Sequence, residues 1–261
     1  MLSWRARKQL TVLLIIAVII VGLGFLIVPK FLPEATCFDN KKNKNEFDID
    51  CGGSCAPCEL RNPKPLSIFW TRAVIARPGT YDVAAEAQNL NEELSSANVE
   101  YEFSLFDGLG LISRKTGKTF ILPQERLHLI ETNLVTTRAP NRVELRILNA
   151  EWQVNQVDKP NLIVERRDYK VMEENGLKQS VIEVSIFNRS VPDYRKVEVN
   201  FTVLDKEGNL LGVNKVLLED LFSNSRKVVK SIWPEELRGV ADTIIIEPRV
   251  NVFDPSAIQR P

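Results

Sequence analysis

The fold is decided by the stretch Val99-Glu-Tyr-Glu-Phe-Ser-Leu-Phe-Asp107, which has a second copy 98 residues further on, Val197-Glu-Val-Asn-Phe-Thr-Val-Leu-Asp205. In both copies apolar side chains alternate with polar ones. A period of two puts one face of the segment on a hydrophobic core and the other in water, as in an antiparallel strand. Each copy ends at an aspartate and is followed by a glycine-bearing turn, which is typical of a hairpin.

The segments around the two copies repeat as well. Each copy is predicted to have a strand before an asparagine-bearing turn, a strand after the hairpin and a closing β-branched strand. The expected strands are Tyr81–Leu90, Arg126–Val135 and Arg142–Leu148 in the first copy, and Gln179–Phe187, Arg226–Trp233 and Thr243–Phe253 in the second. A period of about 100 residues, with about six short strands in each copy, predicts an all-β chain with two tandem antiparallel β-sandwich domains. Proline-bearing boundaries place these domains at residues 63–154 and 160–256.

Both copies resemble the FxLYD and LEA14-like family of small Ig-like sandwich domains. The residues that carry the resemblance are Phe103, Leu105, Phe106 and Asp107, which read F-S-L-F-D, and Phe201, Val203, Leu204 and Asp205, which read F-T-V-L-D. The resemblance implies Ig-like β-sandwiches in a cell-envelope protein. It implies a non-enzymatic role and leaves the ligand open.

An apolar run near the N-terminus, Leu10–Val28, contains 19 residues of which only Thr11 is polar. As a helix it spans roughly 28 Å, close to the ~30 Å hydrocarbon core of a bilayer. The run therefore predicts one transmembrane α-helix at residues 9–30, behind a short N-terminus of residues 1–8. A cleaved signal peptide is the alternative, although its apolar region is usually about 7–15 residues and no A-x-A-like site follows.

The charges around the run do not settle its orientation alone. Arg5, Arg7 and Lys8 lie against the membrane edge, while most of the lysines that follow the run lie further away. Because cytoplasmic flanks are enriched in lysine and arginine, and because the cysteines favour an oxidising side, we expect the N-terminus in the cytoplasm. The expected location is the cell membrane, crossed once, with the bulk of the chain outside.

All four cysteines, Cys37, Cys51, Cys55 and Cys58, fall within 22 residues directly after the run. Outside the cytoplasm they are expected to form two disulfides in a spacer at residues 31–62, with three connectivities open. A four-thiolate zinc site is one alternative, although only the last two cysteines have the usual C-x2-C spacing. A redox-active C-x-x-C pair is the other, but no βαβ unit surrounds it.

Oxygen donors lie between the first two cysteines, namely Asp39, Asn40, Asn43, Asn45, Glu46, Asp48 and Asp50. An EF-hand loop that starts at Asp39 would have Lys44 where glycine is required, so a solvated polar loop is favoured over a Ca²⁺ site. The segment resembles a cysteine module of bacterial and archaeal surface proteins, C-x-D-G-x-x-N-x-x-E-x-x-x-D-C-G-G-x-C-x-x-C. Asn40 replaces its first glycine. The resemblance implies a surface-exposed protein.

No motif in the chain predicts a catalytic residue, a cofactor or a metal site. The only histidine, His128, is expected on the solvent-facing side of its strand, opposite Leu127 and Leu129. The triplets that begin at Asn188 and Asn200 match the N-glycosylation pattern, and Asn200 is expected on an outer face. A net charge of zero with scattered basic residues gives no indication of nucleic-acid binding.

The sequence therefore predicts an anchored envelope protein whose partners are the bilayer, through Leu10–Val28, and an unknown extracytoplasmic protein or cell-wall ligand. A structural scaffold or assembly subunit of an envelope complex is the alternative. An enzyme is a third possibility, but the sequence offers it no site.

Overall fold

The computed structural model describes residues 4, 9, 13–23, 36–43, 45–174 and 176–259. The chain divides into two compact units, Met1–Cys58 and Glu59–Pro261. Each unit is described by itself. The second contains the whole β-structure, and we call it the β unit.

In the first unit, residues 13–23 are helical. Among the described residues, no helix has the length and apolar character that crossing a bilayer requires. The predicted span, Leu10–Val28, lies partly outside the described residues, as does most of the predicted cytoplasmic segment 1–8. The membrane helix stays a prediction.

The β unit begins with a 3₁₀ turn, η1 (Cys58–Arg61), and continues as a series of antiparallel strands. The strands of its first half are β1 (Ser67–Arg77), β2 (Thr80–Gln88), β3 (Leu94–Asp107), β4 (Gly110–Ile121), β5 (Arg126–Val135) and β6 (Arg142–Val154). The elements of its second half are β7 (Leu162–Glu174), β8 (Leu177–Asn188), β9 (Asp193–Leu204), β10 (Leu210–Leu221), β11 (Arg226–Trp233), β12 (Thr243–Arg249), η2 (Pro255–Ala257) and β13 (Ile258–Gln259).

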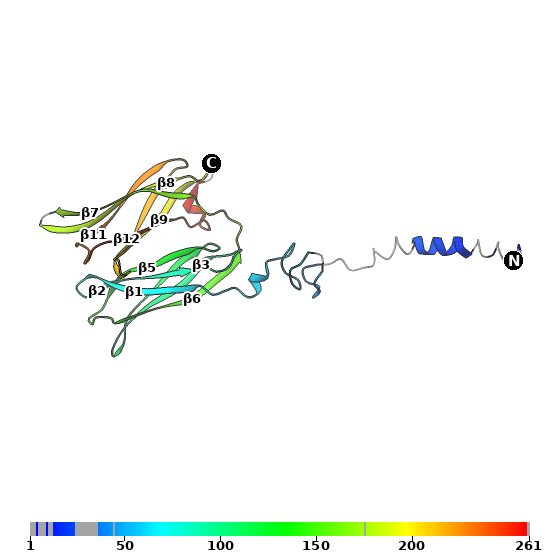
Figure 1. Ribbon diagram of the computed structural model, residues 1–261, viewed down its shortest axis with the longest axis horizontal. Helices are drawn as coiled ribbons and strands as arrows, with labels where there is room; N and C mark the ends of the chain where they lie inside the picture. Colours follow the sequence, from blue (N-terminus) through cyan, green and yellow to red (C-terminus); the bar gives the residue numbers. More distant parts are fainter. Residues whose placement is uncertain are drawn as a thin grey trace. The chain divides into compact units, whose positions relative to one another are not determined.

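These strands form four antiparallel sheets, two in each half (Figure 1). The first half contains the sheets β1-β2-β5 and β4-β3-β6, and the second contains β11-β8-β7 and β10-β9-β12, with β13 added to β9. The six main strands of each half follow the same order in the sheets. For example, the third strand of each half, β3 or β9, is the central strand of its sheet. The prediction of an all-β chain is confirmed.

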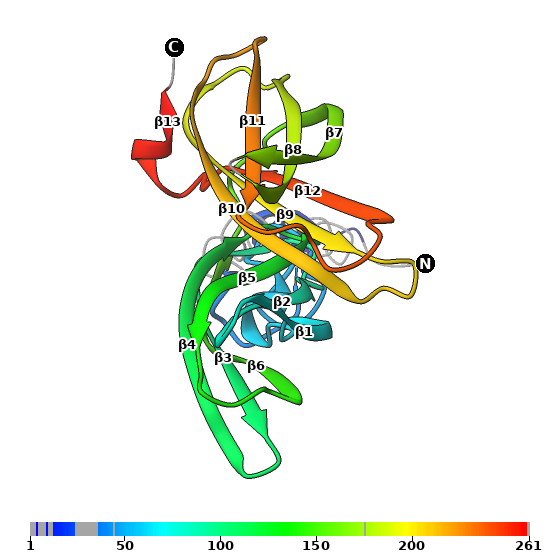
Figure 2. The same ribbon diagram turned by 90° about the vertical axis from the view of Figure 1, so that its left-hand side faces the viewer.

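Three hydrophobic clusters hold the four sheets together as layers. One cluster, around Tyr101 and Phe103, lies between the two sheets of the first half. Another, around Phe201 and Trp233, lies between the two sheets of the second half. The third joins Ala84 of β2 to residues of β5 and β10, so that the sheet β1-β2-β5 faces the sheet β10-β9-β12 (Figure 2). The β unit is therefore a stack of four sheets with a junction in its middle.

The predicted alternation is confirmed along β3, where Val99, Tyr101, Phe103 and Leu105 are at most 1% exposed. β5 and β11 have the predicted bounds. The closing strand β12 ends at Arg249, earlier than predicted, and the turn at residues 252–253 follows it. The domain boundaries at residues 63–154 and 160–256 stay predictions.

A buried asparagine closes the same corner in both halves. Asn89 follows β2, and its Nδ2 donates hydrogen bonds to the backbone oxygens of Leu94 and Leu122 at 2.7 and 2.9 Å. Asn188 ends β8 and makes the two equivalent bonds at 2.9 and 3.2 Å. Neither asparagine is exposed to solvent. Each corner ties the turn after the second strand of its half to the turn before the fifth strand.

Candidate functional site

The junction between the halves buries the only histidine of the chain. Glu247 of β12 accepts a hydrogen bond from the backbone N–H of His128 at 3.0 Å and lies 2.8 Å from His128 Nδ1. Asn200 Nδ2 of β9 donates to the backbone oxygen of His128 at 3.3 Å, and the Trp70 ring lies 5.3 Å from the imidazole. Side chains of the second half therefore bond to the free edge of β5.

A second contact across the junction is a buried ion pair. Arg249 at the end of β12 is 6% exposed and Glu125, in the turn before β5, is 8% exposed. Arg249 Nε donates to Glu125 Oε1 at 3.1 Å, and Nη2 donates to Oε2 at 3.3 Å. The same guanidinium donates to Thr119 Oγ1 and to the backbone oxygen of Phe120. These bonds satisfy the desolvated charges on both sides, as a buried pair requires.

The expected solvent-facing position of His128 is wrong, since this side chain is only 4% exposed. The histidine does lie opposite Leu127 and Leu129, but the second half of the β unit covers that face. Asn200, expected on an outer face, is 2% exposed for the same reason, and Asn188 is closed in its corner. Neither asparagine offers a free amide for glycosylation in the folded protein.

One sequence signal could have revealed this junction. Central outward-facing positions of β2, β5 and β9 carry uncharged residues, namely Ala84, Ile130, Asn200 and Thr202, although Asp82, Glu86 and Glu198 on the same faces weaken this signal. Strand faces that contact water usually carry charged residues, whereas uncharged outward positions favour a covered face.

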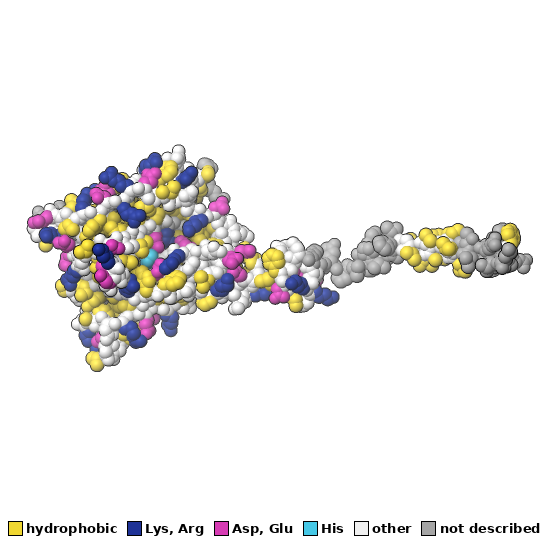
Figure 3. Space-filling model, viewed as in Figure 1, with side chains coloured by type: hydrophobic (Ala, Val, Ile, Leu, Met, Phe, Trp, Pro, Cys, Tyr) yellow, Lys and Arg dark blue, Asp and Glu magenta, His cyan; other side chains and the backbone are white. Residues whose placement is uncertain are grey.

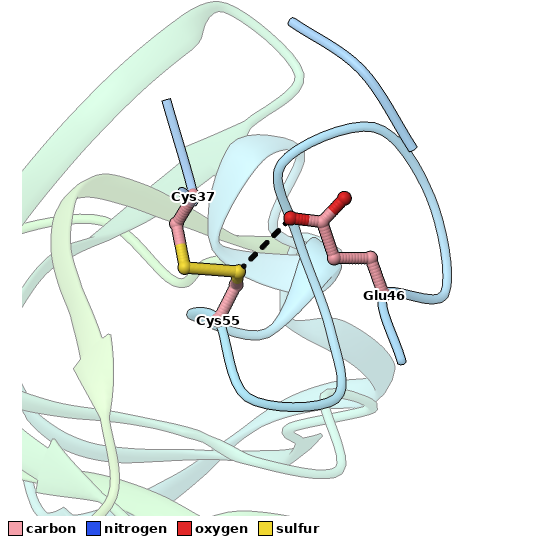
Figure 4. Close-up of side chains that lie close together, drawn as sticks. All are labelled: Cys37, Glu46 and Cys55. Atoms are coloured by element: carbon pink, nitrogen blue, oxygen red, sulfur yellow. Dashed lines mark hydrogen bonds between the residues drawn. A yellow bond between two sulfur atoms is a disulfide. The ribbon is translucent and has the colours of Figure 1, made fainter. Parts of the chain in front are cut away.

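The four cysteines form two disulfides, Cys37–Cys55 and Cys51–Cys58. The prediction of two disulfides is confirmed, and the structure selects one of the three connectivities. All four sulfurs are oxidised, so they offer no thiolates for the zinc alternative. Figure 4 shows Glu46 pointing at the first bridge, with its Oε1 3.2 Å from Cys55 Sγ.

The acidic residues between the cysteines organise the loop instead of standing free in solvent. Asp50 accepts hydrogen bonds from the backbone N–H groups of Asp39 and Asn40, and Glu46 accepts from those of Asn43 and Asp50. Glu46 and Asp50 are buried, which the prediction of a solvated loop missed. Burial opposes ionisation of Asp39, but the Asn43 amide and nearby N–H groups lower the pKa of this carboxyl below its usual range.

The disulfide pairing predicts which cysteine becomes a free thiol when its partner is replaced. In the Cys37→Ala variant, Cys55 is expected to be the free thiol, because the other two cysteines remain paired with each other. Iodoacetamide alkylation of the unreduced variant, followed by peptide sequencing in the mass spectrometer, should place the label on Cys55. The matched variant Cys58→Ala should be labelled on Cys51. A label on Cys51 or Cys58 in the first variant would contradict the pairing.

A cleft of about 430 Å³ opens at one end of the junction. Its walls are Ala73–Arg77 of β1 and Leu211–Asn214 of β10, and the segment Ile232–Arg238, which begins at the end of β11, closes it. Gly212 permits this closure, because a Cβ there would lie 2.7 Å from Leu237 Cδ2 and 2.9 Å from Trp233 Nε1. The cleft combines an apolar floor with a few polar side chains, as ligand sites commonly do.

Asp82 is the buried acid of this cleft. It is 7% exposed, and its Oδ1 accepts a hydrogen bond from the backbone N–H of Asn133 at 2.8 Å. Burial raises the pKa of Asp82, and the Asn133 N–H, Lys115 and Arg77 lower it by less. Among the described residues no cation lies within ion-pair distance of this carboxylate. The charge of Asp82 therefore disfavours folding.

Asp82→Asn is accordingly expected to raise the free energy of unfolding at pH 7, because asparagine keeps an acceptor for the Asn133 N–H and carries no charge. A raised folded-state pKa means that the wild type gains stability as the pH falls toward the unfolded value of about 3.9. The difference between variant and wild type should therefore disappear below about pH 4. Urea unfolding of variant and wild type at pH 7 and below about pH 4 measures this difference in stability, and Asp168→Asn at an exposed position is the control. An Asp82→Asn variant less stable than the wild type at pH 7 would contradict this account.

The face of the β unit seen in Figure 3 carries charges of both signs, interspersed with hydrophobic side chains. No family model matches the chain, and no curated protein matches its sequence. The geometry of the junction, the cleft and the disulfides is therefore the basis for the proposals that follow.

Proposed function

We propose that this chain is a single-pass membrane protein of the cell envelope that displays two Ig-like β-sandwich domains outside the cytoplasm. These domains bind a protein or a cell-wall component and catalyse no reaction. The observation that carries the proposal is the pairing of all four cysteines in disulfides directly after the apolar run. Disulfides persist in oxidising compartments and are rare in the cytosol.

Two observations support the interpretation of the halves as tandem Ig-like domains. Strands in equal order occupy equal places in the sheets of both halves. The buried corners at Asn89 and Asn188 fall at equivalent points and make equivalent hydrogen bonds. A duplicated domain accounts for both.

The segment at the start of the β unit is hydrogen-bonded to the turn that follows β2, which suits a displayed domain pair. Glu59 accepts hydrogen bonds from the backbone N–H groups of Glu92 and Glu93 at 2.9 and 3.1 Å. Burial works against its ionisation, but these N–H groups and Lys64 lower the pKa of Glu59. Lys64 and Asn91 also exchange two hydrogen bonds. The segment that leads into β1 is therefore held against the turn between β2 and β3.

Thiol labelling of intact cells tests the topology. A membrane-impermeant maleimide should label the wild type only after treatment with an impermeant reductant, and a variant with all four cysteines replaced by alanine should stay unlabelled. In that cysteine-free background, Ser3→Cys should be labelled only after the cells are opened. Labelling of the native cysteines without reductant, or only after lysis, would overturn the proposal.

The rigid junction also favours a second candidate, in which the β unit is a scaffold subunit of an envelope complex. Buried ionic and apolar contacts hold its halves in one arrangement, as a scaffold requires. Crosslinking in intact cells separates the two candidates, because a scaffold gives a complex of fixed stoichiometry and a display protein does not.

A further inference from the structure

One stretch of the edge strand β1 lacks the charges and prolines that normally protect an exposed sheet edge. It ends the sheet β1-β2-β5, so among the described residues no strand pairs with its outer edge. Between Arg72 and Arg77 its residues are Ala73-Val-Ile-Ala76, without charge or proline, and Ile75 is 42% exposed. An edge of this kind presents unpaired N–H and C=O groups to any extended chain.

Arg72 and Arg77 of β1 stand on either side of this uncharged stretch. Charges on a sheet edge oppose pairing with other chains. The part of β1 that is open to a further strand is therefore the stretch Ala73–Ala76.

The open edge runs along the cleft. Five consecutive residues, Ala73–Arg77, line it, although successive side chains of a strand point to opposite faces. Asp82 of β2 and Asn133 of β5 line it as well, so the cleft extends from the end of the sheet β1-β2-β5 to the edge of β1. Leu211–Asn214 of the edge strand β10 line the opposite wall in the same way.

The cleft also contains a buried carboxylate, Asp82, on which Lys115 and Arg77 act only from beyond ion-pair distance. Asp82 pairs with Val74 of β1 in the ladder and lines the cleft from the neighbouring strand. Its carboxylate has one backbone N–H partner and no cation within ion-pair distance among the described residues. A basic group that enters the cleft would supply the missing partner, since a charge-assisted hydrogen bond in a desolvated place is stronger than a neutral one.

We propose that the cleft binds an extended peptide, which adds as a strand to the edge of β1 at Ala73–Arg77 and places a lysine or arginine side chain against Asp82. The backbone of the edge supplies main-chain hydrogen bonds, and the apolar floor near Trp233 and Leu237 accepts alternate side chains of the peptide. This is strand addition, in which main-chain bonds provide affinity and pockets provide specificity. The inference rests on the proposed binding function and names its partner as a basic, extended polypeptide segment.

The probe is the synthetic heptapeptide acetyl-Val-Thr-Val-Lys-Val-Thr-Val-amide, compared with the same peptide that has glutamate in place of lysine. With the full chain in detergent micelles, the lysine peptide should slow hydrogen exchange in β1, and peptide anisotropy should show weaker binding of the glutamate peptide. Ile75→Lys should weaken binding of the lysine peptide at least about tenfold. Val228→Lys on the exposed edge of β11 is the matched control and should bind as the wild type does.

Asp82→Asn should abolish the preference for lysine over glutamate while leaving main-chain binding. Absence of protection in β1 at about 1 mM lysine peptide, or unchanged binding by Ile75→Lys, would overturn the proposal. Self-association that Ile75→Lys abolishes and the peptide does not displace would also overturn it, because a second copy would then occupy the edge. None of these outcomes depends on the membrane topology, which thiol labelling tests separately.

Discussion

Arg249→Met is expected to lower the free energy of unfolding by about 3–5 kcal/mol, because it leaves the carboxylate of Glu125 buried without its partner. The variant also removes the donors to Thr119 and to the backbone oxygen of Phe120. Methionine retains most of the aliphatic volume, so the loss reports mainly on charge and hydrogen bonding. Urea unfolding of the full chain in detergent, followed by tryptophan fluorescence, measures the difference.

The double variant Arg249→Met with Glu125→Gln separates an uncompensated charge from lost packing. Glutamine keeps an oxygen acceptor for the backbone N–H of Leu122, which donates to Glu125 at 2.8 Å. We therefore expect the double variant to be more stable than Arg249→Met alone. Equal stability of the two would show that the buried charge is not the cause. The exposed pair Arg142–Glu144 is the control, and Arg142→Met should cost less than about 1 kcal/mol.

Asn89→Ala is expected to destabilise the β unit by about 2–4 kcal/mol. The substitution removes the two hydrogen bonds that Nδ2 donates to the backbone oxygens of Leu94 and Leu122, and it leaves the Leu122 oxygen with only the longer bond from the Glu125 N–H at 3.3 Å. It also removes the acceptor for the backbone N–H of Asn91. Since each buried unpaired group costs about 1–3 kcal/mol, the loss exceeds that of an ordinary hydrogen bond.

The matched control is Asn149→Ala on β6, whose exposed side chain makes only one long contact, with Glu151 at 3.5 Å. It should change the stability by less than about 0.5 kcal/mol. Asn188→Ala should repeat the large effect in the second half. If Asn89→Ala and Asn149→Ala were equally mild, the corner would not be a stabilising element of the fold.

The strands of the β unit could be predicted largely from the sequence because their signal is local. Alternation along Val99–Asp107 and its second copy identifies the buried face, and the turn residues set the ends of β5 and β11. The length of β4 could not be predicted in this way, because polar residues such as Lys115 mask the ladder that continues through them.

The candidate sites were less predictable because they depend on contacts between distant segments. His128 and Glu247 lie 119 residues apart, and nothing near either residue indicates the other. The disulfide pairing likewise follows from how the loop folds around Glu46 and Asp50, not from cysteine spacing. Asp82 could not be identified from the sequence as a buried acid, since its carboxylate loses contact with solvent only where β10 closes the cleft.

The way the two halves contact each other has a consequence for assembly. The joined faces are not equivalent, because the sheet β1-β2-β5 of one half meets β10-β9-β12 of the other. Such a heterologous, head-to-tail contact has no internal closure, so further copies could in principle extend the stack into a fibre. The outward faces prevent this. Where Ala84 pairs with Ile130 at the junction, the corresponding pair in the second half is Glu183 and Lys230, an ion pair at 2.9 Å.

The outer face at the opposite end of the stack also carries charged side chains. Asn200 of the junction corresponds to Glu102 on the outer face of β3, and Arg114 and Arg146 lie beside it within 3.9 Å. Stacking another copy on either end would desolvate these charges, at a cost that an apolar neighbour could not offset. Charged side chains on both outer faces therefore oppose the addition of further copies at either end of the stack.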